Sequence, residues 1–160
     1  MDRFVANFTL RLDSKGRVSI PASFRSVLAR DGFDGLYCYP ALALPAIDAG
    51  GNALMAEIEA LIARYAPFST ERERLALALY GTSETLKLDG EGRVVLSESL
   101  QRHAGITDQV AFVGLGHKFQ IWEPGKFRNE LAEATDKVRA LKAELGSQAA
   151  AARTALGARE

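Results

Sequence analysis

The pattern of apolar and polar positions repeats itself within the chain. In residues 10–21, apolar side chains alternate with polar ones on both sides of a short polar stretch, and residues 86–97 show the same pattern. Asp13 and Asp89, which open the two polar stretches, are 76 positions apart. Alternation with a period of two is typical of strands with one buried face, so each copy predicts two strands joined by a turn. The duplication itself predicts two similar structural units.

The polar stretch of each copy has the composition of a tight turn. An aspartate can accept hydrogen bonds from backbone N–H groups two residues further on, and a glycine adopts the left-handed backbone conformation without steric cost. Asp13 and Gly16 hold these positions in the first copy, and Asp89 and Gly92 hold them in the second. We therefore expect all four to be turn-forming residues of two β-hairpins.

The remaining periodicities predict a chain of the α+β class. Short strands are expected at residues 36–40 and 42–45, with a plain linker at residues 48–52. Apolar positions three and four apart over residues 53–80 predict a pair of helices, because Pro67 interrupts the run. The predicted parts are a first repeat at residues 1–52, connecting helices at 53–80, a second repeat at 81–128, and a C-terminal helix and tail at 129–160. The Ala-rich end of that tail is expected to be frayed.

The charges balance overall but not along the chain. The 160 residues include 20 Lys and Arg against 20 Asp and Glu, so the formal net charge is zero. Such a balance is unlike that of a generally basic nucleic-acid binder. Residues 1–32, however, contain six Lys and Arg but only three Asp. The first repeat is therefore locally basic.

The sequence shows no arrangement of catalytic or cofactor-binding residues, so we do not expect an enzyme. It lacks a phosphate-binding loop, a dinucleotide fingerprint and a Gly-x-Ser-x-Gly motif. His103 and His117 have no second ligand at metal spacing, so no metal and no other cofactor is expected. Cys38, the single cysteine, is predicted to be a core residue, and its isolation fits a reducing cytoplasm. We find no signal peptide or membrane-spanning run, and expect a cytoplasmic location.

Several cations near the two turns are predicted to point away from the core. An arginine fork matches the O6 and N7 acceptors of guanine and is always charged. A solvated arginine, or one bonded only to the aspartate of its own turn, is the alternative, but duplication of the basic pair favours DNA contact. Glu91 stands where the first copy has Lys15, so the two copies are expected to contribute unequally. The predicted DNA-binding residues are Arg11, Lys15 and Arg17 in the first copy, and Lys87 and Arg93 in the second.

The two motifs, residues 12–18 and 88–94, resemble those of the MraZ family of bacterial transcriptional regulators, as do residues 103–106 and 113–123. The resemblance implies two AbrB-like swapped-hairpin (double-split β-α-β) repeats about a pseudo-twofold axis. It also implies a ring-shaped homo-oligomer that binds double-stranded DNA through the Asp-x-x-x-Arg motifs. The implied targets are promoter repeats ahead of the division and cell-wall gene cluster, which would associate the protein with the nucleoid.

The rival hypothesis keeps the fold but changes the partner. An oligomeric protein-interaction module of the same fold, such as a scaffold or an antitoxin-like protein, would bind another protein without specific DNA binding. The migration of labelled promoter DNA in a gel distinguishes the two hypotheses.

Overall fold

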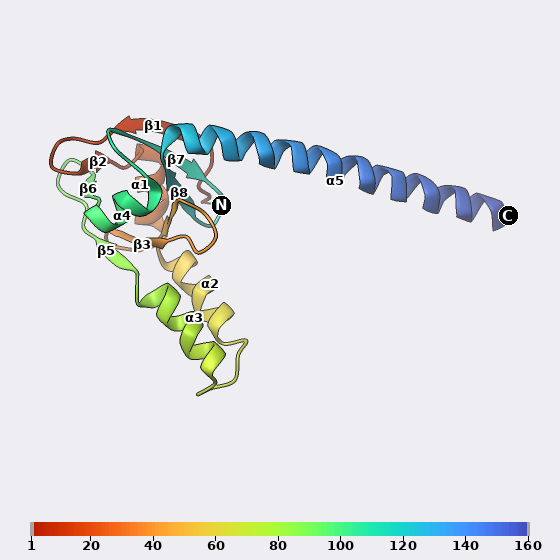
Figure 1. Cartoon of the computed structure of the whole chain (residues 1–160), viewed down its shortest axis with the longest axis horizontal. Coiled ribbons are helices and arrows are strands. Elements are labelled where there is room, and N and C mark those ends of the chain that lie inside the picture. The colour runs from red at the N-terminus through yellow and green to blue at the C-terminus, as the bar shows by residue number, and fades with distance from the viewer. Residues whose placement is uncertain (1, 160) are drawn as a thin grey trace. The chain divides into compact units, whose positions relative to one another are not determined.

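The computed structural model describes residues 2–159. The chain divides into two compact units, one that ends at Pro124 and one that begins at Gly125. The first unit contains all eight strands and four helices of the described residues, and a fifth helix forms the second unit (Figure 1). The predicted α+β class is therefore confirmed.

A six-stranded antiparallel sheet lies at the centre of the first unit. Its strands follow in the order β1 (Asn7–Arg11), β7 (Gln109–Gly114), β8 (Phe119–Trp122), β4 (Ile47–Gly50), β3 (Leu36–Pro40) and β5 (Glu84–Leu86). A separate two-stranded ribbon pairs β2 (Arg17–Ser19) with β6 (Arg93–Val95). The two duplicated motifs thus contribute strands to both sheets.

The strands on the two sides of each turn do not pair with each other, so the prediction of two simple hairpins is wrong. β1 precedes the first turn but pairs with β7, whereas β2 follows that turn and pairs with β6. Val18 and Val94 lie opposite each other in the ribbon, and each is only 1% exposed. Strands β2 and β6 therefore pair with each other, and their valines belong to the same hydrophobic core.

Strand β4 corrects two further predictions. The strand expected at residues 42–45 is a run of bends, and the linker expected at residues 48–52 includes most of a fully buried strand. Gly50 allows the following helix to approach, since a β carbon there would lie 3.0 Å from the Cβ of Leu54. The carboxylate of Asp48 is hydrogen-bonded, which allows a charged residue in a central strand. Glycine and aspartate usually indicate turns, so the local pattern was misleading here.

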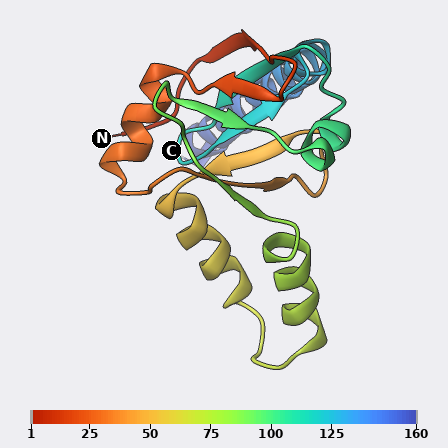
Figure 2. The same cartoon turned by 90° about the vertical axis from the view of Figure 1, so that its left-hand side faces the viewer.

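Four helices complete the first unit. They are α1 (Ala22–Arg30), α2 (Asn52–Ile62), α3 (Thr70–Tyr80) and α4 (Glu98–Ala104). The predicted helical pair is confirmed in α2 and α3, which lie side by side and project from the sheet (Figure 2). Helix α3 is capped by Ser69, whose Oγ accepts a hydrogen bond from the backbone N–H of Arg72 at 3.2 Å.

Two groups of buried side chains stabilise the first unit. The larger group fills the space between the sheet, the ribbon and the short helices, with Phe24, Phe112 and Phe119 among its fully buried members. The smaller group connects α2 and α3 to β3. Its buried members are Tyr37, Tyr39, Leu54, Ile58, Ile62 and Leu79. The helical pair therefore has a core of its own.

The second unit is formed by helix α5 (Pro124–Arg159). This helix continues past Gly146, so the predicted fraying of the Ala-rich end is wrong. Alanine has the highest intrinsic helix propensity, which explains why the segment stays helical without buried anchors. None of the helices in residues 2–159 is long and apolar enough to cross a membrane.

Candidate nucleic-acid interface

The carboxylate of Asp13 organises the first turn. Its Oδ1 atom accepts hydrogen bonds from the backbone N–H of Lys15 at 2.9 Å and of Arg17 at 2.8 Å. Its Oδ2 atom accepts a third from the Nε of Arg17 at 2.7 Å. Gly16 has a φ of +79°, a conformation that residues with a side chain rarely adopt. The turn thereby orients the Arg17 side chain, while Lys15 is exposed at the tip.

The second turn reproduces this arrangement around Asp89. Its Oδ1 accepts the backbone N–H groups of Glu91 and Arg93, both at 2.9 Å, and its Oδ2 accepts the Nε of Arg93 at 2.8 Å. Gly92 has a φ of +76°. The carboxylate of Glu91 lies 3.5 Å from the Nη1 of Arg93. The second arginine therefore faces two acidic side chains where the first faces one.

Hydrogen bonding lowers the pKa of both turn aspartates. For Asp13 the largest cause is the backbone N–H of Arg17, and for Asp89 it is the backbone N–H of Arg93. The pKa of Arg93 is raised, chiefly by its side-chain hydrogen bond to Asp89. Near neutral pH, both turns consequently keep an ionised carboxylate paired with a charged guanidinium.

The ribbon joins the two turns. The backbone carbonyl of Gly16 accepts a hydrogen bond from the N–H of Leu96 at 2.8 Å, and that of Gly92 accepts one from Ile20 at 3.0 Å. Because β2 and β6 run antiparallel, the first turn adjoins the end of β6 and the second turn adjoins the end of β2. The two turns therefore lie at opposite ends of one ribbon.

Two further side chains reach the turns, and sequence reasoning did not select them. Arg25 on α1 donates through Nη1 to the carbonyl that follows β2, and a β carbon at Gly92 would lie 2.9 Å from its Nε. Gln101 on α4 donates through Nε2 to the carbonyl that follows β6, at 2.8 Å, and a β carbon at Gly16 would lie 3.2 Å from the same atom. Each turn thus contacts the helix that follows the other turn. The signal was available, because Arg25 and Gln101 are also 76 positions apart.

The five predicted DNA-binding residues do not form one cluster. Lys15, Arg17 and Arg93 belong to the ribbon turns. Arg11 ends β1, opposite Gln109, and Lys87 follows β5, and both are exposed. Since β1 and β2 do not pair, Arg11 and Arg17 are not the cross-strand neighbours that the hairpin prediction required. The side chains of Arg17 and Arg93 are 33% and 27% exposed, so their aspartates and the adjoining chain cover them in part.

The histidines and the cysteine have local contacts. The Nε2 of His117 lies 2.5 Å from a carboxylate oxygen of Glu57, and the Nε2 of His103 lies 3.1 Å from the carbonyl oxygen of Leu44. Burial raises the pKa of the Cys38 thiol to about 12, in agreement with its predicted position in the core. Within residues 2–159, no three potential metal ligands lie together.

The site thus consists of two arginines, each held by an aspartate on a tight turn, at the two ends of one ribbon. Comparisons with known proteins identify the family. A family model described as "MraZ protein, putative antitoxin-like" matches residues 79–153. A protein of Xanthobacter autotrophicus named transcriptional regulator MraZ is 68% identical over 149 residues, which cover 93% of this chain and 95% of that protein.

Relatives with higher and lower sequence identity to this chain carry the same name. The transcriptional regulator MraZ of Azorhizobium caulinodans is 69% identical over 147 residues, with 92% of this chain and 94% of that protein covered. The one of Rickettsia bellii is 41% identical over 134 residues, with 84% of this chain and 87% of that protein covered. The chain belongs to the MraZ family.

Proposed function

We propose that this protein is a sequence-specific DNA-binding transcriptional regulator that acts as a ring-like homo-oligomer on promoter repeats. The observation that carries the proposal is the duplicated turn, in which an aspartate holds an arginine in the same geometry twice. The names of its relatives support a role in transcription. The proposed target is the promoter of the division and cell-wall gene cluster, and the proposed location is the cytoplasm, in association with the nucleoid.

The turn arginines are suited to reading base edges. In Arg17 and Arg93 the Nε is already bonded to an aspartate, so the guanidinium is oriented before DNA arrives. A good bidentate contact to guanine contributes about 1–3 kcal/mol of discrimination, too little for one turn to select a site. The exposed Lys15, Arg11 and Lys87 are proposed as phosphate contacts, which position the protein without reading sequence.

Several turns must therefore act together. We propose that the two halves of the first unit are AbrB-like swapped-hairpin repeats related by a pseudo-twofold axis. Equivalent pairings support this relation, since β1 pairs with β7 as β5 pairs with β3, while β2–β6 and β4–β8 each pair a strand with its counterpart in the other half. Linked copies in a ring can raise the effective affinity by about 10²–10⁴ where the spacing of the DNA repeats matches.

An oligomeric protein-interaction module is the second candidate. The observation that favours it is that each turn arginine already has an internal carboxylate partner, as a turn with a purely structural role would. The description of the matching family model as antitoxin-like also fits a protein partner.

Footprinting on the DNA upstream of this protein's own gene tests the proposal. We expect protection at regularly spaced short repeats by the wild-type chain, and its loss in a double variant with Arg17→Ala and Arg93→Ala. Arg74→Ala, which removes an exposed arginine on α3, is the matched control and should leave protection intact. Equal affinity for upstream and scrambled duplexes would favour the protein-interaction module.

A further inference from the structure

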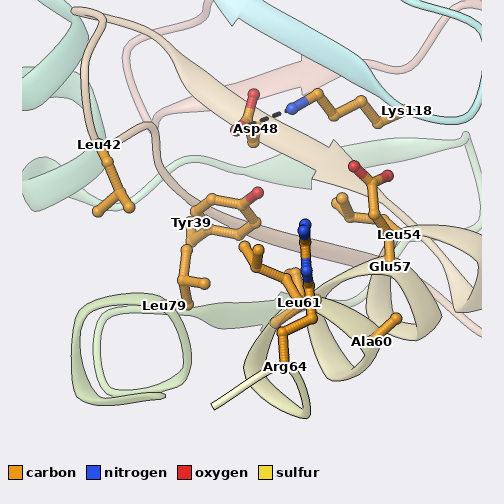
Figure 3. Close-up of a pocket in the computed structure, with 11 residues that line it drawn as sticks. Tyr39, Leu42, Asp48, Leu54, Glu57, Ala60, Leu61, Arg64, Leu79 and Lys118 are labelled. Carbon is orange, nitrogen blue, oxygen red and sulfur yellow. Dashed lines mark hydrogen bonds and ion pairs between the residues drawn. The ribbon is translucent and has the colours of Figure 1, made fainter. Parts of the chain in front are cut away.

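A cavity of about 450 Å³ opens between the helical pair and the sheet (Figure 3). Its walls are mainly apolar and come from β3, the bends that follow it, and helices α2 and α3. The wall residues that matter here are Tyr39, Leu42, Leu54, Leu61 and Leu79. Leu42 and Leu61 lie at its mouth, where they are 63% and 39% exposed. Cavities of this size and character can accept a large apolar side chain or a small ligand.

The polar end of the cavity is internally satisfied. Asp48 accepts hydrogen bonds from the Nζ of Lys118 at 3.2 Å and from the Nε2 of Gln120 at 2.8 Å, and Gln120 accepts one from the indole of Trp122 at 2.9 Å. Burial, followed by the charge of Asp48, raises the pKa of Tyr39, which keeps its hydroxyl protonated. The other acidic side chain of the lining, Glu57, has a carboxylate oxygen 2.5 Å from the Nε2 of His117. The apolar walls are therefore the part of the cavity that an occupant would contact.

The cavity lining also contains Arg64. Figure 3 shows the Arg64 side chain, just after the end of α2, extending toward the side of the cavity where Tyr39 and Lys118 lie. Among residues 2–159, the guanidinium of Arg64 has no hydrogen bond or ion pair, and Arg64 is exposed. The cavity thus offers apolar walls and a free cation to whatever enters it.

The far end of the same helical pair carries the complementary features. Phe68, between α2 and α3, is 95% exposed and has a φ of +65°, which is unusual for a bulky residue. Backbone strain of this kind persists mainly at functional positions. Glu71 and Glu73, in the first turn of α3, are exposed carboxylates without an ion pair among the described residues. The tip, residues 65–73, therefore combines an apolar side chain with two carboxylates, while its own cation, Arg72, donates to the carbonyl of Tyr65.

We propose that the tip of one copy enters the cavity of a second copy, with Phe68 between the apolar walls and Glu71 or Glu73 next to Arg64. The occupant is a second copy because both the side chain that fits and the charge that complements are present in this chain. The two surfaces differ, so the contact is heterologous and propagates from copy to copy until it closes into a ring. This inference rests on the ring-like assembly proposed above and names the contact that builds it.

Complementation between two variants tests the contact. The tip variant is Phe68→Asp, and the cavity variant combines Leu42→Glu with Arg64→Glu. All three substitutions are at exposed positions, so both variants should fold. We expect the mass of each variant, measured by light scattering, to fall below that of the wild type. Mixing them in equal amounts should double the mass, because each pair retains one intact tip and cavity and cannot extend further.

Val5→Asp is the matched control, since Val5 is also 63% exposed but lies outside the tip and the cavity. This variant should keep the wild-type mass. If both variants keep the wild-type mass, or if the mass of the mixture does not increase, the proposed contact between tip and cavity is wrong. Such a result would not contradict the ring-like assembly itself. A wild-type mass near the 17.3 kDa of one chain contradicts the ring itself.

Discussion

The two duplicated turns share one framework but present different charges. The three hydrogen bonds that Asp13 accepts are matched by those of Asp89, and corresponding distances differ by no more than 0.1 Å. At the tip, however, Lys15 of the first turn is replaced by Glu91. The comparison separates two roles. Aspartate, glycine and the backbone N–H groups fix the shape of the turn, and the residue at the tip is free to set its charge.

Side chains from helices α1 and α4 reduce the difference in charge between the two turns. Arg25 adjoins the second turn, whereas the uncharged Gln101 adjoins the first. The first turn then has two cations and one carboxylate, and the second has two cations and two carboxylates. A formal charge of about +1 thus stands against about zero, by the ordinary ionisation of these groups at pH 7. The crossed contacts make the charge of each turn depend on both halves of the chain.

Removal of the turn arginines should have the largest effect on DNA affinity and should show whether the two turns differ. Arg17→Ala is expected to weaken binding to upstream DNA by on the order of 10- to 100-fold for each turn engaged, because the proposed base-edge contact is lost. Arg93→Ala should weaken it less, since Arg93 also faces Glu91 at 3.5 Å. Binding isotherms on upstream and scrambled duplexes measure both effects, with circular dichroism to show that the variants fold. Equal losses of DNA affinity in the two variants would mean that the charge at the tip does not decide how much each turn contributes to binding.

A charge reversal at the tip of the second turn should strengthen DNA binding rather than weaken it. Glu91→Lys gives the second tip the residue type of the first, so that the second turn has three cations and one carboxylate, and it removes the ion pair to Arg93. We expect several-fold tighter binding to any duplex, because an added phosphate contact carries no sequence information. The measurement is the dissociation constant on upstream and scrambled DNA at fixed salt. Glu59→Lys, at an exposed position on α2 and away from both turns, is the control for a change in overall charge.

Loss of the first tip lysine should have a smaller effect that is visible mainly in its salt dependence. Lys15→Ala removes one proposed phosphate contact from an exposed position. The slope of the logarithm of the binding constant against the logarithm of salt concentration should decrease by roughly 0.9 for each turn engaged. The ratio of upstream to scrambled affinity should stay constant. A changed ratio would assign Lys15 to base recognition instead.

The features that follow from local sequence were predictable. Asp13, Gly16 and their counterparts indicate turns, because the required backbone geometry and hydrogen bonds are set within five residues. The pairing of β2 with β6 was not predictable from alternation alone, since a period of two shows which face is buried but not which strand is the neighbour. Asp48 was misplaced for a similar reason. Its partners, Lys118 and Gln120, are distant in sequence.

The pKa values of the two turn aspartates provide the smallest test of the comparison. Both lie below the ordinary value of 3.8, and in both the largest cause is a backbone N–H group, not the side chain at the tip. Exchange of the tip charges, by Lys15→Glu together with Glu91→Lys, should therefore leave both pKa values below 3.8. A carboxyl group whose pKa is lower in the folded state stabilises that state above its unfolded pKa, and this contribution is lost as the pH falls through the folded pKa.

The turns should accordingly remain intact at pH 4 and lose their carboxylate hydrogen bonds only below 3.8. Carboxyl carbon chemical shifts of Asp13 and Asp89, followed by NMR from pH 7 to pH 2, measure the two titrations directly. The backbone N–H shifts of Arg17 and Arg93 should change over the same pH range, because these groups donate to the titrating oxygens. If the exchange of tip charges moves either titration to 3.8 or above, the tip charge rather than the backbone controls the turn, and the separation of framework from charge does not hold.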